Sequence, residues 1–105
     1  MSLLASISAR LGQAQQRHEE VGILLGTPEI IADQKRFREL SMEYAQLGPV
    51  VETWNKWQQA GRTLDEAKSL LKSPDVEMHE LANEEIESAT ERQRQLEEHL
   101  NVLLL

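Results

Sequence analysis

The stretch "IIADQKRFRELSMEYAQLGPVVETW", residues 30–54, decides the fold because a strongly helical run carries Gly48-Pro49 within it. A Gly-Pro pair often ends a helix, and a chain that turned there would form a compact bundle of short helices. Apolar side chains nevertheless keep spacings of three and four residues across the pair. They are Phe37, Leu40, Tyr44, Leu47, Val51 and Trp54. This unbroken stripe favours one helix through the pair, since a chain that turned back would have no reason to keep the register.

Continuity has to overcome the cost of the proline. Pro49 removes one backbone hydrogen bond and clashes with the carbonyl of Ala45, which costs about 3 kcal/mol or more in a helix interior. Burial of the large apolar side chains on both sides stabilises the helix by roughly 1.5–3 kcal/mol each. We therefore expect a long helix from about residue 33 to residue 72, kinked near Gly48-Pro49. Its length would be on the order of 60 Å at 1.5 Å per residue.

An earlier segment carries the same spacing and ends at recognisable stop signals. Its stripe consists of Leu4, Ile7, Leu11, Ala14, His18, Val21 and Leu25. Gly26 then predicts a helix end, and Thr27-Pro28 is typical of a cap followed by the proline of a first helical position. A short turn of helix through residues 29–31 follows, and Asp33 is the expected N-cap of the long helix.

Ser73-Pro74-Asp75 is the next firm stop, with Ser73 expected as the cap and Pro74 as the first residue of a third helix. The third stripe consists of Met78, Ala82, Ile86, Ala89, Gln93, Leu96, Leu100 and Leu103. Because the connection is short, the second and third helices must be antiparallel neighbours, and the first can pack on their seam. We predict an all-α, elongated, antiparallel three-helix bundle with coiled-coil-like packing, in which residues 1–105 form a single domain.

Charge and cysteine content narrow the function. The formal net charge of −7 argues against a direct grip on nucleic acid, because phosphate contacts need clustered Lys and Arg. The chain has no cysteine, which fits a reducing compartment. The closing apolar run at residues 100–105 is far short of the roughly 20 residues that span a membrane. We expect a cytoplasmic protein with no membrane partner.

No motif for catalysis, metal binding or cofactor binding is found in the sequence. His18, His79 and His99 lie on different segments, and none has the helical partner of a metal site or the Glu-x-x-His pattern of a di-iron bundle. Phosphate-binding loops and nucleophile elbows are also absent. His18 is on the apolar stripe, so we expect a partly buried core histidine. We predict no catalytic, metal or cofactor residues and no enzyme activity.

Two features leave alternatives open. Trp54 and Trp57 share a helix face and could be core residues or a platform on which nucleic-acid bases stack. The acidic outer face of the third helix, represented here by Glu80, Glu84 and Glu87, could simply be solvated. It could also be a docking surface for a basic partner.

Several blocks of the sequence carry a resemblance that covers essentially the whole chain. They are "RHEEV" (residues 17–21), "LLG" (24–26), "IADQKRFRELSMEYAQL" (31–47) and the closing "LNVLLL". Together they closely resemble the N-terminal domain of bacterial class I peptide chain release factors, and the block at 31–47 favours the factors that decode UAA and UAG.

The resemblance implies a role in translation termination at the ribosome. The family hydrolyses peptidyl-tRNA with a Gly-Gly-Gln loop and reads stop codons with a Pro-x-Thr-type element, and this sequence contains neither. The chain therefore looks like the N-terminal domain of a longer factor, a non-catalytic binding arm. The implied partners are the GTPase-associated region at the base of the ribosomal stalk and the GTPase release factor. Self-association of the isolated domain is possible.

Two other function classes compete with this interpretation. The chain could be a free-standing helical adaptor that dimerises through its apolar stripes. It could also be an enzyme of the di-metal bundle class, which the missing Glu-x-x-His pairs oppose.

Overall fold

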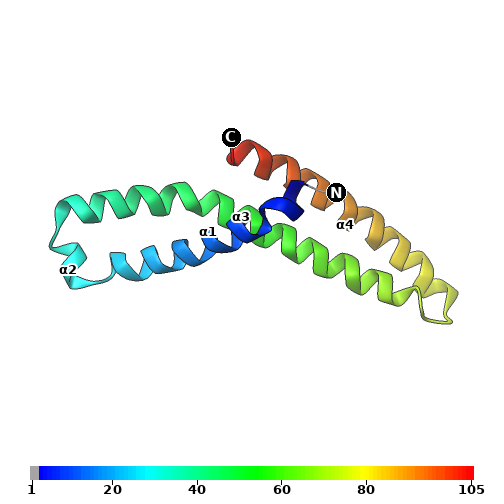
Figure 1. Cartoon of the computed structure of the whole chain (residues 1–105). Helices are drawn as coiled ribbons and strands as arrows, with labels where there is room; N and C mark the ends of the chain where they lie inside the picture. Colours follow the sequence, from blue (N-terminus) through cyan, green and yellow to red (C-terminus); the bar gives the residue numbers. More distant parts are fainter. Residues whose placement is uncertain (1–2) are drawn as a thin grey trace. The chain divides into compact units, whose positions relative to one another are not determined.

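A computed structural model of the chain describes residues 3–105, with side chains from residue 7 onward. Within these residues the chain forms helices and no strand, which confirms the all-α prediction. The helices are α1 (Leu3–Leu25), α2 (Pro28–Ile31), α3 (Gln34–Leu70) and α4 (Val76–Leu103) (Figure 1).

Helix α3 runs through Gly48-Pro49 without interruption, as the unbroken apolar stripe predicts. Its first turn is capped by Asp33, whose Oδ1 accepts a hydrogen bond from the Arg36 backbone N–H at 3.2 Å. With 37 residues the helix is about 55 Å long. The kink expected at Gly48-Pro49 and the elongated three-helix arrangement of the whole chain stay predictions.

The chain divides into two compact units, and the boundary between Glu52 and Thr53 lies inside α3. The N-terminal unit contains α1, α2 and the first half of α3, and the C-terminal unit contains the second half of α3 and α4. Each unit is a pair of long helical segments. The interpretation of residues 1–105 as one domain stays a prediction.

In the N-terminal unit, α1 lies antiparallel to the first half of α3. The rings of His18 and Tyr44 stack, with centroids 4.1 Å apart and planes 11° from parallel. Four residues later in α1, Gly22 faces the same tyrosine: a Cβ there would stand only 3.2 Å from Tyr44 Cε2. His18 also neighbours Gly48, one turn further along α3. His18 is half-buried, as predicted. Because Gly22 has no side chain, the Tyr44 ring can pack directly against the backbone of α1.

Helix α1 ends before Gly26, as expected, but not through the left-handed glycine cap that ends many helices. No described residue has a positive φ angle. The N–H groups of Gly26 and Thr27 instead donate to the carbonyls of Ile23 and Leu24, each at 3.0 Å, which tightens the last turn. Pro28 is the first residue of α2, as predicted, and Ile30 is buried.

In the C-terminal unit, alanines line both helices of the pair. Ala60 and Ala67 are buried on α3, and Ala82 and Ala89 are buried on α4; both pairs are spaced seven residues apart. Side chains this small let two helices approach closely. The predicted α4 stripe is confirmed from Ala82 to Leu103, where its members are buried or half-buried, but its first member, Met78, is 38% exposed.

The start of α4 differs from the sequence prediction. The N-cap is Asp75, not Ser73, and Pro74 lies before the helix instead of in its first position. The Asp75 carboxylate accepts a hydrogen bond from the Glu77 N–H at 3.0 Å, while the Ser73 hydroxyl accepts one from the Asp75 N–H at 3.2 Å. The serine thus closes the turn that precedes the helix, and the carboxylate caps the positive end of the helix dipole.

Candidate docking surfaces

The acidic residues singled out in the sequence lie together on α4. Glu80, Glu84 and Glu87 are all exposed, and their spacing of four and three places them on one face of the helix. Their side chains make no hydrogen bond or ion pair with any residue in the described range 3–105. Their negative charge is therefore available to an external partner.

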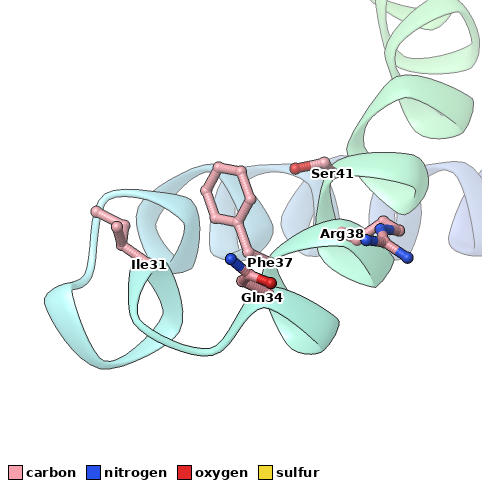
Figure 2. Close-up of a pocket in the computed structure, with 5 residues that line it drawn as sticks. All are labelled: Ile31, Gln34, Phe37, Arg38 and Ser41. Carbon is pink, nitrogen blue, oxygen red and sulfur yellow. The ribbon is translucent and has the colours of Figure 1, made fainter.

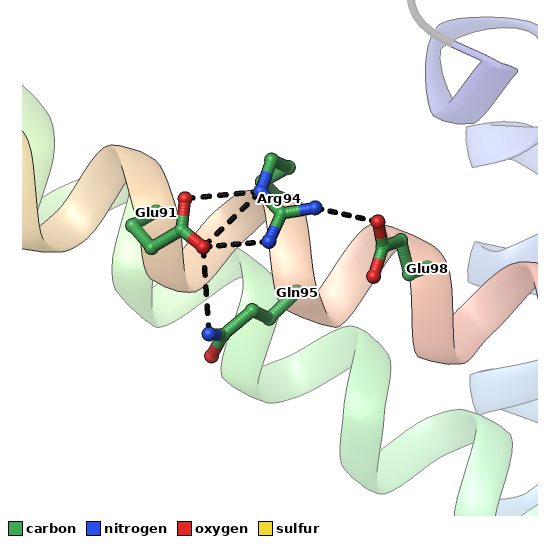
Figure 3. Close-up of polar contacts among 4 residues, drawn as sticks. All are labelled: Glu91, Arg94, Gln95 and Glu98. Atoms are coloured by element: carbon green, nitrogen blue, oxygen red, sulfur yellow. Dashed lines mark hydrogen bonds and ion pairs between the residues drawn. The ribbon is translucent and has the colours of Figure 1, made fainter.

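Further along α4 the acidic charge is partly neutralised within the helix. Arg94 donates to Glu91 on one side, with Nη2 2.6 Å from Oε1, and forms an ion pair with Glu98 on the other (Figure 3). Gln95 also donates to Glu91, at 3.4 Å. The hydrogen bonds from Arg94 lower the pKa of Glu91 below its ordinary value. Within α4, the carboxylates without a partner among the described residues thus lie in the first half of the helix.

A bidentate ion pair joins the two helices of the N-terminal unit. Arg17 Nε donates to Glu43 Oε2 at 2.6 Å, and its Nη2 donates to Oε1 at 2.8 Å. Glu20 adds a longer ion pair with Arg17, at 3.8 Å. The hydrogen bond from Arg17 lowers the pKa of Glu43, with their charge attraction as a smaller cause. The pair lies beside the His18–Tyr44 stack and helps to set the register of α1 against α3.

An open groove of about 440 Å³ lies where α2 meets the start of α3 (Figure 2). Its lining consists of Ile31, Gln34, Phe37, Arg38 and Ser41. The four residues from α3 are spaced three, one and three apart and so form one helix face. Ile31 supplies the opposite wall from the end of α2, and Figure 2 shows its side chain and the Phe37 ring standing above the ribbon.

Phe37 is less buried than its place on the predicted stripe suggested. It is 38% exposed, and Ile31 is 55% exposed. The register set by His18 and Gly22 puts Phe37 opposite the α1–α2 connection, where α1 has already ended. The stripe therefore continues beyond the helix that covers it, and its first member becomes part of a surface.

Three cations follow closely along the start of α3. Arg38 lines the groove, Lys35 lies on the neighbouring face, and Arg36 lies on the opposite side of the helix. All three are exposed, and their side chains make no hydrogen bond or ion pair within the described part of the chain. On an acidic chain such a cluster is conspicuous, and three cations within four residues are a signal that the sequence itself carries. The sequence interpretation missed it because it weighed the total charge and not its local distribution.

The tryptophans belong to the interior of the C-terminal unit. Trp54 is buried and stacks on Trp57, with centroids 5.2 Å apart and planes 8° from parallel. Gln93 of α4 donates to the Trp57 carbonyl at 3.4 Å, and the buried Trp57 indole nitrogen has no hydrogen-bond partner among the residues that the structure describes. This placement supports the core interpretation over a base-stacking platform.

Among the described residues, no three His, Cys, Asp or Glu side chains are placed to hold a metal ion. Likewise, no helix within residues 3–105 has the length and apolar character needed to cross a bilayer.

Comparison with known proteins identifies the family. The sequence model of one protein family, the PCRF domain, matches residues 14–105, which is most of the chain. No solved structure matches it. The chain therefore belongs to the PCRF domain family and is a member of the class I peptide chain release factors, which act in translation termination.

Proposed function

We propose that this chain is the non-catalytic, partner-contacting arm of a longer release factor that acts at UAA and UAG codons. One observation carries the proposal: exposed charged side chains without an ion pair among the described residues follow one another closely at two places. They are basic at the start of α3 and acidic in the first half of α4. Surfaces of this kind are suited to binding a partner of complementary charge.

Hydrolysis of peptidyl-tRNA would then belong to a Gly-Gly-Gln-containing segment encoded downstream. The reading frame of the parent gene tests this directly, and a stop codon just after Leu105 would count against it. The codon specificity rests on the resemblance of residues 31–47 to factors that decode UAA and UAG. Release of a labelled peptide by the parent factor should occur on ribosomes programmed with UAA or UAG and not with UGA.

The proposed partners are the GTPase-associated region at the base of the ribosomal stalk and the GTPase release factor, both in the cytoplasm. The open acidic face of α4 suits a basic partner surface, since complementary charge steers association and fixes orientation. The test compares the wild-type chain with the double variant Glu84→Lys and Glu87→Lys for binding to the purified stalk-base protein. Glu19→Lys, at an exposed position of α1, is the matched control. Unchanged binding by the double variant tells against the acidic face.

A free-standing adaptor that self-associates is the second candidate. It is favoured by apolar side chains exposed at the start of α4, where Leu81 is 55% exposed and Val76 is 69% exposed. Burial of the stripes within the chain counts against dimerisation through them. Sedimentation equilibrium distinguishes the two candidates: an adaptor gives a concentration-dependent dimer, and an arm stays monomeric at high micromolar concentration.

A further inference from the structure

We propose that the groove formed by Ile31, Gln34, Phe37, Arg38 and Ser41 binds an acidic helix of a partner protein, anchored by an apolar side chain. The inference rests on the proposed function, because it specifies the kind of partner that the arm contacts. The acidic face of α4 is a separate surface and plays no part in it.

The groove has the composition of an anchor site. Ile31 and Phe37 supply apolar walls from two different helices, and both remain substantially exposed in the chain alone. Gln34 and Ser41 add polar groups along the rim. Partner contacts are commonly built this way, with an apolar or aromatic anchor at the centre and polar groups around it. The exposed phenylalanine has an explanation in the fold, because α1 ends before it can cover that position.

The charge of the groove selects an acidic occupant. Arg38 lines the groove, and Lys35 lies one helical turn before it on the neighbouring face of α3. Neither side chain has a partner within residues 3–105. Two other arginines of the chain pair internally, Arg17 with Glu43 and Arg94 with Glu91 and Glu98. The cations at the groove have no such internal pair, and carboxylates on a partner could form ion pairs with them.

A protein helix fits these features better than RNA does. A phosphate backbone needs a run of several cations, and it gains nothing from the apolar walls of the groove. The net charge of −7 on the chain also repels it. The α3 lining follows positions i, i+3, i+4 and i+7, so the groove runs along the helix. A partner helix lying along it presents anchors at the same spacing, which is the usual way that amphipathic helices bind grooves.

The probe for this inference is a set of synthetic helical peptides of equal length. The first carries leucines spaced three and four residues apart, flanked by glutamates. The second has lysines in place of the glutamates, and the third has serines in place of the leucines. A single-stranded oligouridine is the fourth ligand. Each is titrated into the ¹⁵N-labelled 105-residue chain, and the amide chemical shifts of residues 30–41 report binding.

We expect saturable shifts in residues 30–41 with the acidic leucine peptide alone. Arg38→Glu should weaken that binding about tenfold, because it turns an attraction into a repulsion. Arg92→Glu, the same change at an exposed arginine of α4, should leave it within about twofold. Phe37→Ser should also weaken binding. Should that variant unfold, as judged by its circular dichroism, Arg38→Glu still decides the question.

Several outcomes overturn the inference. They are equal shifts with the lysine peptide, shifts with the oligouridine instead, no shift at the groove with any ligand, or no effect of Arg38→Glu. Self-association that Arg38→Glu abolishes would assign the groove to a second copy. A second measurement, binding to the stalk-base protein, distinguishes failure of this inference from failure of the proposed function. If that binding survives Arg38→Glu, the groove is not its docking site and the arm role stands; if the wild-type chain does not bind, the arm role itself is wrong.

Discussion

Gly22 and Gly48 both lie in helices of the N-terminal unit, yet alanine at these positions has different expected effects. Neither glycine has a positive φ angle, so an L side chain is compatible with both backbones. The difference is the space for a methyl group. At Gly48 the nearest heavy atom outside its own chain neighbours, His18 Nε2, is 4.0 Å from the new Cβ, which is ordinary contact, but the ring of the following Pro49 crowds a Cβ on a helical residue before it. At Gly22 the new Cβ would lie 3.2 Å from Tyr44 Cε2, and the ring must move.

The magnitudes follow from helix propensity and from the aromatic stack. Gly12→Ala should stabilise the chain by about 1 kcal/mol, the usual difference between the two residues in a helix interior. This corresponds to a rise in melting temperature of roughly 4 °C for a chain of this size. Gly48→Ala should gain less than Gly12→Ala, because the Pro49 ring crowds the Cβ of the helical residue before it. Gly22→Ala has the same propensity gain but displaces Tyr44 from His18, and such ring pairs stabilise by about 0.5–1.5 kcal/mol. We expect no net gain from Gly22→Ala.

Urea denaturation followed by circular dichroism at 222 nm measures both free energies of unfolding. Gly12→Ala is the matched control for Gly22→Ala, because both lie in α1 and a Cβ at Gly12 meets nothing within 4 Å. The expected order places Gly12→Ala above Gly48→Ala, with Gly22→Ala no higher than the wild type. If Gly22→Ala stabilises as much as Gly12→Ala, the packing of α1 against α3 described above is wrong.

Three further predictions concern caps, packing and pH. Asp75→Ala should lower the free energy of unfolding by about 1 kcal/mol in urea denaturation, and Ser73→Ala by less, because the aspartate caps α4. Ala89→Leu should destabilise by about 1–3 kcal/mol in thermal melts through overpacking, whereas Thr90→Leu on the exposed face should be tolerated. Glu43 has a pKa below its ordinary 4.5 because of its arginine partner, so its stabilising effect is present above pH 4.5 and is lost as the pH falls through the lowered value. Melting temperatures of wild type and Glu43→Gln should therefore differ above pH 4.5 and converge in more acidic solution, and a difference independent of pH contradicts this.

The apolar spacing predicted the long helices well because most members of each stripe are buried or half-buried. Continuity through Pro49 followed from the register of Val51 and Trp54, and both are buried. The spacing does not say which helix covers a stripe. The first half of α3 packs on α1 and the second half packs on α4. Because the apolar stripe of α3 is continuous, its spacing does not show where the packing partner changes. The choice between Ser73 and Asp75 as the cap was also beyond reach, because both are good capping residues two positions apart.

Some features of the candidate surfaces could be predicted from the sequence, and others depend on how the helices pack. Exposure of the α4 acidic residues could be predicted, since they lie opposite the stripe on an amphipathic helix. The Arg17–Glu43 ion pair joins residues 26 positions apart, so it depends on a register that the sequence leaves open. The groove depends on where α1 ends and how α2 turns the chain into α3. Only the run of cations at Lys35, Arg36 and Arg38, of which Arg38 lines the groove, could be recognised beforehand.

The most direct test of the central claim is binding of the fluorescently labelled chain to purified large ribosomal subunits, with peptide release measured on complete ribosomes in parallel. The account predicts saturable binding that unlabelled chain competes away, weakened binding by the double variant Glu84→Lys and Glu87→Lys, and no release of peptide at a UAA codon. Release of peptide by the chain alone, or the lack of any saturable binding, would contradict the assignment of this chain as a non-catalytic arm.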